Sequence, residues 1–273
     1  LIIGANGFTG RRILNDLSVN PIYHVTGCSL RDDICPGKDY RFVRTDIRDE
    51  DEVRKLFKEC RPDIVINTSA LSVPDYCETH HAEAEATNVT AVETIAHVCE
   101  QYGSRFIHLS TDFVFDGKST RLYKEEDEAI PVNYYGVTKL KAEKIIASIC
   151  SNYAIVRVVV VYGKALPGQH GNILQLVANR LRNGETIRVV SDQWRTPTFV
   201  GDISVGVEKL MFHTANGIYH ICGSECLTIA EIAYRVADFL KLDRSLIEPV
   251  TTEEMKEVTP RPRFSGLSIE KAK

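Results

Sequence analysis

The stretch "LIIGANGFTGRRI", residues 1–13, places three glycines between a short apolar run and the start of a helical pattern. Gly4, Gly7 and Gly10 thus fall between a predicted strand and a predicted helix, the context in which a glycine fingerprint is informative. A tight turn, a close approach of backbone to pyrophosphate and close helix packing each exclude a Cβ atom, and the helix N-terminus offers N–H groups to the anion. The stretch therefore predicts a dinucleotide-binding loop. The alternative is a glycine-rich turn without a ligand.

Outward from this loop, short apolar runs alternate with segments whose apolar residues recur at helical spacing. Such alternation is typical of βαβ units and a parallel sheet, and the Ile- and Val-rich runs suit strands that are buried on both faces. We therefore predict an α/β fold with a Rossmann-type doubly wound parallel sheet. The predicted strands are "LIIG" (1–4), "YHVTGCS" (23–29), "YRFVRTD" (40–46), "DIVINTS" (63–69), "RFIHLS" (105–110) and "AIVRVVVVYG" (154–163).

The rhythm changes after residue 163, where loop-like and polar segments separate the predicted helices. A helix near 201–213 and a strand in "GIYHICG" resemble a return to the sheet. We therefore expect two interleaved parts. The dinucleotide-binding domain takes residues 1–160 with about 201–222, and a smaller substrate lobe takes about 161–200 and 223–273.

Composition narrows the class of partner. The net charge is −4 with a pI near 6.1, which gives no electrostatic footprint for nucleic acid or an anionic membrane surface. The chain has no apolar run of transmembrane length and no charged signal region at its start, so we expect a cytoplasmic protein. The eight cysteines lack the spacing of a zinc site or a disulfide framework, so we expect no metal and mostly reduced thiols.

The cofactor is predicted from the residues that follow the glycines. An NAD site usually has an acidic residue at the end of the second strand, but here Arg31 precedes any acid and Arg11 follows the last glycine. A 2'-phosphate would find cations there, which favours NADPH, with NADH as the alternative; surface charge would also explain either arginine. Asp46 after the third strand is expected near the adenine, or else as the cap of the helix "DEDEVRKLF". The fourth strand ends in "NTSA", residues 67–70, at the edge where ligands bind.

A second constellation lies in "NYYGVTKLKAE", residues 133–143, where Tyr135 and Lys139 are four apart at the start of a predicted helix. Ser110 and Thr111 end the preceding strand, so these side chains are expected to converge beside the nicotinamide. A cation beside a phenol favours the phenolate and brings its pKa towards the working range. Thr111 would supply a second hydrogen bond to a substrate oxygen.

These residues resemble the extended short-chain dehydrogenase/reductases, which carry GxxGxxG, a Ser or Thr at a strand end and YxxxK. The resemblance narrows to the dTDP-4-dehydrorhamnose reductase family through "STDFVFDG", "YKEEDEAIPVNYYGVTKLKAE", "DQWRTPT" and "RPRFSGLSIEKAK", and spans essentially the whole chain. It implies an NAD(P)H-dependent oxidoreductase that reduces the C4 keto group of dTDP-4-dehydro-6-deoxy-L-mannose to dTDP-L-rhamnose.

In that reaction Tyr135 would donate the proton, Lys139 would tune the tyrosine and hold the nicotinamide ribose, and Thr111 would polarise the carbonyl. The other residues expected at the cofactor are Gly4, Gly7, Phe8, Thr9, Gly10, Arg31, Asp46, Ile47, Thr68, Ser69, Ala70 and Asn88. Those expected at the substrate, besides Thr111, are Ser72, Val160, Asn172 and Arg261, with Gln193, Thr196 and Thr198 in the same lobe.

One departure from the family pattern keeps other functions open. Family members tend to have a Trp where this chain has Val160, which bears on the sugar, so a reductase or epimerase of another nucleotide sugar is an alternative. The third residue of "TDF" disfavours dehydration, and Asp112 and Asp116 are expected to be structural. The remaining alternative is a non-catalytic NADP-binding subunit resembling the regulatory β subunit of methionine adenosyltransferase. A homodimer is a further open expectation.

Overall fold

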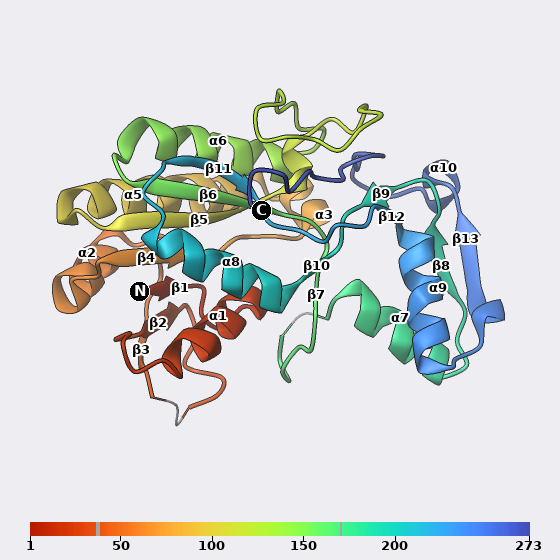
Figure 1. Ribbon diagram of the computed structural model, residues 1–273, viewed down its shortest axis with the longest axis horizontal. Coiled ribbons are helices and arrows are strands. Elements are labelled where there is room, and N and C mark those ends of the chain that lie inside the picture. The colour runs from red at the N-terminus through yellow and green to blue at the C-terminus, as the bar shows by residue number, and fades with distance from the viewer. Residues whose placement is uncertain (37–38, 170) are drawn as a thin grey trace.

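The computed structural model describes residues 1–36, 39–169 and 171–273, and its centre is a parallel sheet of seven strands in the order β11-β6-β5-β4-β1-β2-β3 (Figure 1). Every neighbouring pair in this sheet is parallel, so the predicted doubly wound sheet is confirmed. The strands are β1 (Ile2–Ile3), β2 (Thr26–Ser29), β3 (Arg41–Arg44), β4 (Ile64–Asn67), β5 (Arg105–Thr111), β6 (Tyr153–Val158) and β11 (Gly217–His220).

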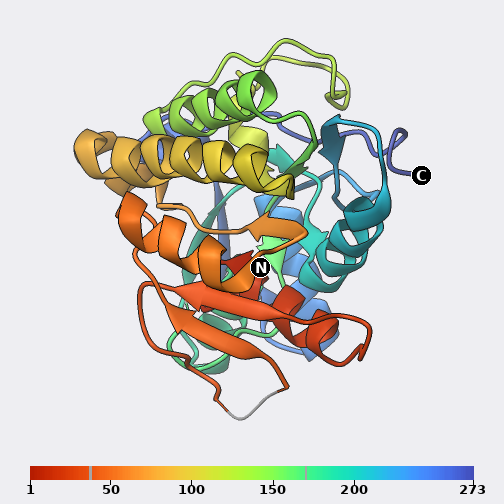
Figure 2. The same cartoon turned by 90° about the vertical axis from the view of Figure 1, so that its left-hand side faces the viewer.

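Helices cover both faces of the sheet (Figures 1 and 2). One face packs against α2 (Glu50–Cys60), α5 (Ala91–Tyr102) and α6 (Tyr134–Ile149), and the other against α1 (Phe8–Ser18) and α8 (Val200–Phe212). Successive strand residues point to opposite faces, so Ile3 joins the first apolar cluster while Ile2 joins the second. Two separate cores therefore sandwich the sheet.

Short elements connect the strands at the edge where they end. Between β4 and α5 the chain forms α3 (Pro74–Thr79), α4 (His81–Glu85) and the π-helical turn η1 (Ala86–Thr90), and between β5 and α6 it forms the 3-10 turn η2 (Asp112–Val114). π-Turns are rare and are frequent at functional sites. The candidate site lies at this edge.

The remaining elements form an outer group with its own apolar core, beyond the carboxyl ends of the strands (Figure 1). Residues of α7 (Ile173–Arg182) and α9 (Ile229–Leu240) pack against the parallel pair β8 (Ile187–Val190) and β13 (Ile247–Val250). The group also contains β9 (Trp194–Arg195) paired with β12 (Leu227–Thr228), η3 (Arg244–Leu246) and α10 (Thr252–Met255). Residues 200–220 lie between its two segments in sequence and contain α8 and β11, while the exact lobe boundaries stay a prediction.

One predicted strand is wrong in its length. The run 154–163 does not form one strand, because β6 ends at Val158 and β7 (Val161–Tyr162) pairs instead with β10 (Thr198–Phe199). Between them Val160 has a φ of 38°, a left-handed conformation that is rare for a β-branched residue. In the described residues we find no helix with both the length and the apolar character to span a bilayer.

Candidate active site

The glycine loop is as close-packed as its sequence predicts. Gly4 has a φ of +80°, and a Cβ there would lie 2.7 Å from the backbone nitrogen of Ser69. A Cβ on Gly10 would lie 2.3 Å from the carbonyl oxygen of Gly4. Gly7 begins α1 without a side-chain cap, and the first turn, with Phe8 and Thr9, carries no acidic residue. The amides at this helix start are therefore suited to an anion.

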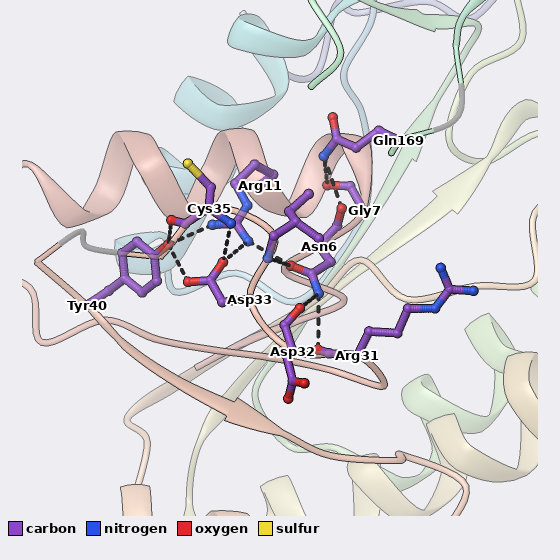
Figure 3. A network of polar contacts seen from close by, with 10 residues as sticks. Asn6, Gly7, Arg11, Arg31, Asp32, Asp33, Cys35, Tyr40 and Gln169 are labelled. Atoms are coloured by element: carbon purple, nitrogen blue, oxygen red, sulfur yellow. Dashed lines mark hydrogen bonds and ion pairs between the residues drawn. The ribbon is translucent and has the colours of Figure 1, made fainter. Parts of the chain in front are cut away.

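Arg11 is not free to bind a phosphate, in contrast to the expectation that a 2'-phosphate would find both arginines. Its guanidinium is buried, donates to Asp33 at 2.5 Å and Asn6 at 2.7 Å, and donates to the Tyr40 hydroxyl at 2.7 Å (Figure 3). Burial acts to raise the pKa of Asp33, but hydrogen bonds from the Cys35 amide, Tyr40 and Arg11 outweigh it and lower that pKa. The ion pair orders the loop after β2.

Arg31 is the other arginine that was predicted to lie near a ribose phosphate. Its backbone carbonyl accepts a hydrogen bond from Asn6, while its exposed side chain extends away from the Arg11 network (Figure 3). Among the described residues, no carboxylate lies within ion-pair distance of this guanidinium. The backbone of Asp32 is held by the same Asn6 amide, so an acidic side chain stands next to Arg31.

Asp46 and Ile47 follow β3, as expected, but Asp46 does not cap the next helix. Asp49 does so, by accepting from the backbone amides of residues 51 and 52. Asp46 is paired with Arg48 at 2.6 Å, and hydrogen bonding from that guanidinium lowers its pKa.

The end of β4 packs beside the glycine loop. The Thr68 hydroxyl donates to the carbonyl of Ile3 at 2.8 Å, and Ser69 and Ala70 follow it. Asn88, on η1, accepts from the amide of Leu71 at 2.8 Å and donates to its carbonyl at 3.0 Å. Asn88 is buried and holds this loop in place, and Ser72 is exposed next to it.

Tyr135 and Thr111 are brought together. Asn133 caps α6 by accepting from the amide of Gly136, and a Cβ on Gly136 would lie 2.1 Å from the carbonyl oxygen of Phe113. This close approach sets the start of α6 against η2. Burial raises the pKa of Tyr135, and the nearby hydroxyl of Thr111 opposes that rise.

Lys139 makes its contacts with β5. Its Nζ donates to the carbonyl of Leu109 at 2.7 Å and lies 2.9 Å from Nε2 of His108. Burial lowers the pKa of Lys139 to about 8, while the nearby carboxylate of Glu143 opposes that fall. The expected lowering of the Tyr135 pKa by Lys139 does not appear, because burial raises that pKa instead.

Two of the predicted substrate residues, Asn172 and Arg261, bond to other protein groups. The Asn172 side chain accepts from the amide of Gln175 in a capping box and donates to the carbonyl of Gly163, so Asn172 caps the start of α7. Arg261 lies 3.1 Å from Glu257 and 3.6 Å from Asp75, and is only partly exposed. The side chains of Asn172 and Arg261 therefore both bond to other groups of the protein.

Three polar residues expected in the substrate lobe also bond to protein groups. Gln193 donates to Glu257 at 2.6 Å. Thr196 accepts from the amide of residue 267 at 3.1 Å, and Thr198 donates to the carbonyl of residue 159 at 2.7 Å.

Sequence reasoning missed a buried ion pair below Thr111. Asp112 is buried, accepts from Thr111 at 3.2 Å and from Ser265, and lies 3.7 Å from the buried Arg195. Burial raises the pKa of Asp112, although the Arg195 charge acts against it. The pair links η2 with β9. Asp116 accepts from the Tyr123 hydroxyl at 2.8 Å, in the structural role that was predicted for it.

The family profile of the RmlD substrate binding domain matches residues 1–273. The chain belongs to this family. It is 30% identical over 271 residues to the probable low-salt glycan biosynthesis reductase Agl14 of Haloferax volcanii, covering 98% of this chain and 89% of that protein. It is also 32% identical over 276 residues to methionine adenosyltransferase 2 subunit beta of Xenopus laevis, covering 99% of this chain and 80% of that protein.

Among solved structures, the fold is similar to that of dTDP-4-dehydrorhamnose reductase from Bacillus anthracis in complex with NADP, with a TM-score of 0.86 and 26% identity over 99% of this chain and 90% of that one. The predicted superfamily and fold are confirmed, and the predicted oxidoreductase class is confirmed at the level of the family. Among the described residues no cluster of metal-ligating side chains occurs.

Proposed function

We propose that this protein reduces the C4 keto group of dTDP-4-dehydro-6-deoxy-L-mannose to dTDP-L-rhamnose with NADPH. The observation that carries the proposal is the placement of Tyr135 against Thr111 at the same sheet edge as the glycine loop. The similarity to a reductase in complex with NADP supports the choice of cofactor and reaction.

Each group of residues at the site would have its own role in the proposed reaction. The dinucleotide, when bound, would supply the hydride. The amides at the start of α1 would hold its pyrophosphate, and the loop after β4 would lie beside it. Tyr135 would give its hydroxyl proton to the alkoxide oxygen that forms at C4, and the hydroxyl of Thr111 would orient that oxygen. Lys139 as an ammonium would favour the phenolate left on Tyr135.

For the cofactor, Arg31 supports a preference for NADPH because its charge can pair with a 2'-phosphate. Arg11 contributes nothing to that preference, since Asp33 neutralises it. Asp32 beside Arg31 would accept from a ribose hydroxyl, which keeps NADH as a second cofactor.

Two alternatives have specific support. A regulatory NADP-binding subunit is favoured by the 32% identity to methionine adenosyltransferase 2 subunit beta and by the contact of Lys139 with His108. A reductase or epimerase of another nucleotide sugar is favoured by Val160, which offers no aromatic surface to a sugar ring. A cytoplasmic location, a homodimer and the two-part division of the chain stay proposals.

The test measures NADPH oxidation with the dTDP-linked keto-sugar, with NADH and a UDP-linked keto-sugar as comparisons. Oxidation that is specific to the dTDP sugar would support the proposal. Binding of NADP without turnover of any keto-sugar would contradict it and favour the regulatory alternative.

The chain offers a matched control for the proton donor. Tyr135→Phe should lower kcat on the order of 100-fold or more, because it removes the general acid. Tyr134→Phe should leave kcat unchanged, because the Tyr134 hydroxyl donates to Glu85 and its ring stacks on His81. Equal kcat in the two variants would rule out Tyr135 as the donor.

A further inference from the structure

A chain of buried polar contacts leads from the end of β4 to Lys139. The backbone N–H of Ser69 donates to Oδ1 of Asn67 at 3.0 Å, and the Ser69 hydroxyl donates to the same oxygen. This fixes the Asn67 amide, whose Nδ2 lies 3.2 Å from Nδ1 of His108. Nε2 of His108 lies 2.9 Å from Nζ of Lys139. Asn67 and His108 are fully buried and Lys139 is 2% exposed.

The hydrogen-bonding capacity of each group decides which atoms carry protons. An amide nitrogen only donates, so Nδ1 of His108 must accept from Asn67. A neutral imidazole has one acceptor nitrogen and one N–H, so the hydrogen of His108 is on Nε2. Turning the ring over would place carbons at both contacts and lose both bonds. Nε2–H therefore faces Nζ of Lys139, which can accept only as a neutral amine because an ammonium has no lone pair.

The other charged groups around Lys139 do not supply a free counter-charge. Glu143 lies one helical turn further along α6, but its carboxylate is held by the Arg157 guanidinium at 2.6 Å. On η2, Asp112 faces Arg195. Each nearby carboxylate is thus paired with an arginine. Burial of Lys139 then acts in the same direction as the His108 contact, towards the neutral amine.

We propose that His108 is a positioning residue that sets the protonation state of Lys139. The imidazole N–H donates to the amine in the arrangement seen here. When Lys139 takes up a proton from solvent, it must donate to Nε2, and the imidazole hydrogen must move to Nδ1, where it meets the Asn67 amide. The imidazole stays neutral throughout, and one proton is gained in total.

The consequence for chemistry rests on the proposed function. A neutral Lys139 cannot favour the phenolate of Tyr135, so the tautomer of His108 would govern the alkaline limit of turnover. Lys139 and His108 would titrate as one unit, and the fixed Asn67 amide would set its midpoint.

The direct test is the tautomer of His108 in the cofactor-free protein, read from long-range ¹H–¹⁵N NMR spectra as a function of pH. We expect Nε2–H at alkaline pH and Nδ1–H at lower pH, with a midpoint well below the ordinary lysine pKa of about 10.4. His108→Phe assigns the signal, and the exposed His24 is the internal control. Persistence of Nδ1–H up to the ordinary lysine pKa would overturn the proposal.

A single isosteric substitution, Asn67→Asp, should reverse the tautomer preference of His108. In Asn67→Asp the carboxylate can still accept from Ser69, but it also accepts from Nδ1–H of His108. That tautomer suits an ammonium, so the midpoint should rise by about one pH unit or more. An unmoved midpoint would contradict the proposal. The wild-type spectra remain decisive if this variant does not fold.

The same variant separates this proposal from the proposed function. If both hold, the alkaline limb of kcat/KM moves to higher pH in Asn67→Asp by the shift that NMR measures. A tautomer switch in a protein without ketoreductase turnover would refute the proposed function alone. Turnover with an alkaline limb that ignores Asn67→Asp would refute the role of His108 alone.

Discussion

The buried ion pair between Glu143 and Arg157 holds helix α6 to the sheet, and its removal should cost more than the loss of any surface pair. Glu143 accepts from Nε of Arg157 at 3.0 Å and from Nη2 at 2.6 Å, and also from Ser110 on β5. Both charged side chains are about 2–3% exposed. Glu143→Gln keeps one acceptor oxygen but turns an amide N–H₂ towards the guanidinium.

The expected loss of stability in Glu143→Gln depends on the Arg157 charge that remains buried after the substitution. Nη1 of Arg157 has no hydrogen-bond partner in the part of the chain that the structure describes, so the remaining charge would be buried and without a counter-charge. Breaking a buried pair from one side costs about 3–5 kcal/mol. Because the amide oxygen keeps one bond, we expect Glu143→Gln to lower the free energy of unfolding by about 3 kcal/mol.

The assay is urea denaturation of the full chain, with the slope m compared between variants so that a change in midpoint reports stability. The matched control is Glu185→Gln, which removes a carboxylate from the exposed pair with Arg180 and should cost less than about 1 kcal/mol. A loss in Glu143→Gln no larger than that of the control would refute the argument that this pair anchors α6.

Three further changes test other parts of the site. Arg31→Ala should weaken NADPH binding about tenfold in Kd with little effect on NADH, because it removes one charge-assisted contact. Arg12→Ala should change neither Kd, because the Arg12 guanidinium is paired with Asp16 at 2.6 Å on α1; titration of both cofactors checks this. Gly136→Ala should lower kcat about 10- to 100-fold, since its Cβ would displace α6 from the carbonyl of Phe113; kcat near wild type would contradict this. Burial, with the Arg157 charge, lowers the pKa of His220 to about 3, so the unfolded state binds a proton that the native state does not. Stability should therefore fall from pH 6.5 towards 3 by up to about 1.4 kcal/mol per unit, and His220→Phe should flatten that slope in urea titrations.

The sheet and the main features of the site were predictable because they depend on local patterns. The strand runs end in glycines or small polar residues, and parallel topology puts those ends at one edge, so Gly4 and Thr111 share that edge. The pairing of Tyr135 with Thr111 follows from the same rule. A run of four valines, in contrast, hides the end of β6, because no breaker residue marks Val160.

Other side chains proved to have structural partners that the sequence analysis did not assign to them. Asn172 was predicted as a substrate contact. The spacing of Asn172 and Gln175 is also that of a capping box, so the helix start could have been predicted from the sequence. Arg11 looked free because its partner Asp33 is brought to it only by the fold of the loop after β2. His108 lies inside a strand and meets Lys139 across 31 positions, a contact that no local pattern encodes.

The two apolar clusters, one on each face of the sheet, become complete at different times during synthesis of the chain. The cluster beneath α2, α5 and α6 draws its buried members from residues up to 155, so it can close once β6 has emerged from the ribosome. The opposite cluster needs Ile203, Val207 and Leu210 of α8, which follow only after α7 and β8 have been made. Until then one side of the nascent sheet exposes apolar surface, and this is the interval in which the chain is most prone to aggregate or to need a chaperone.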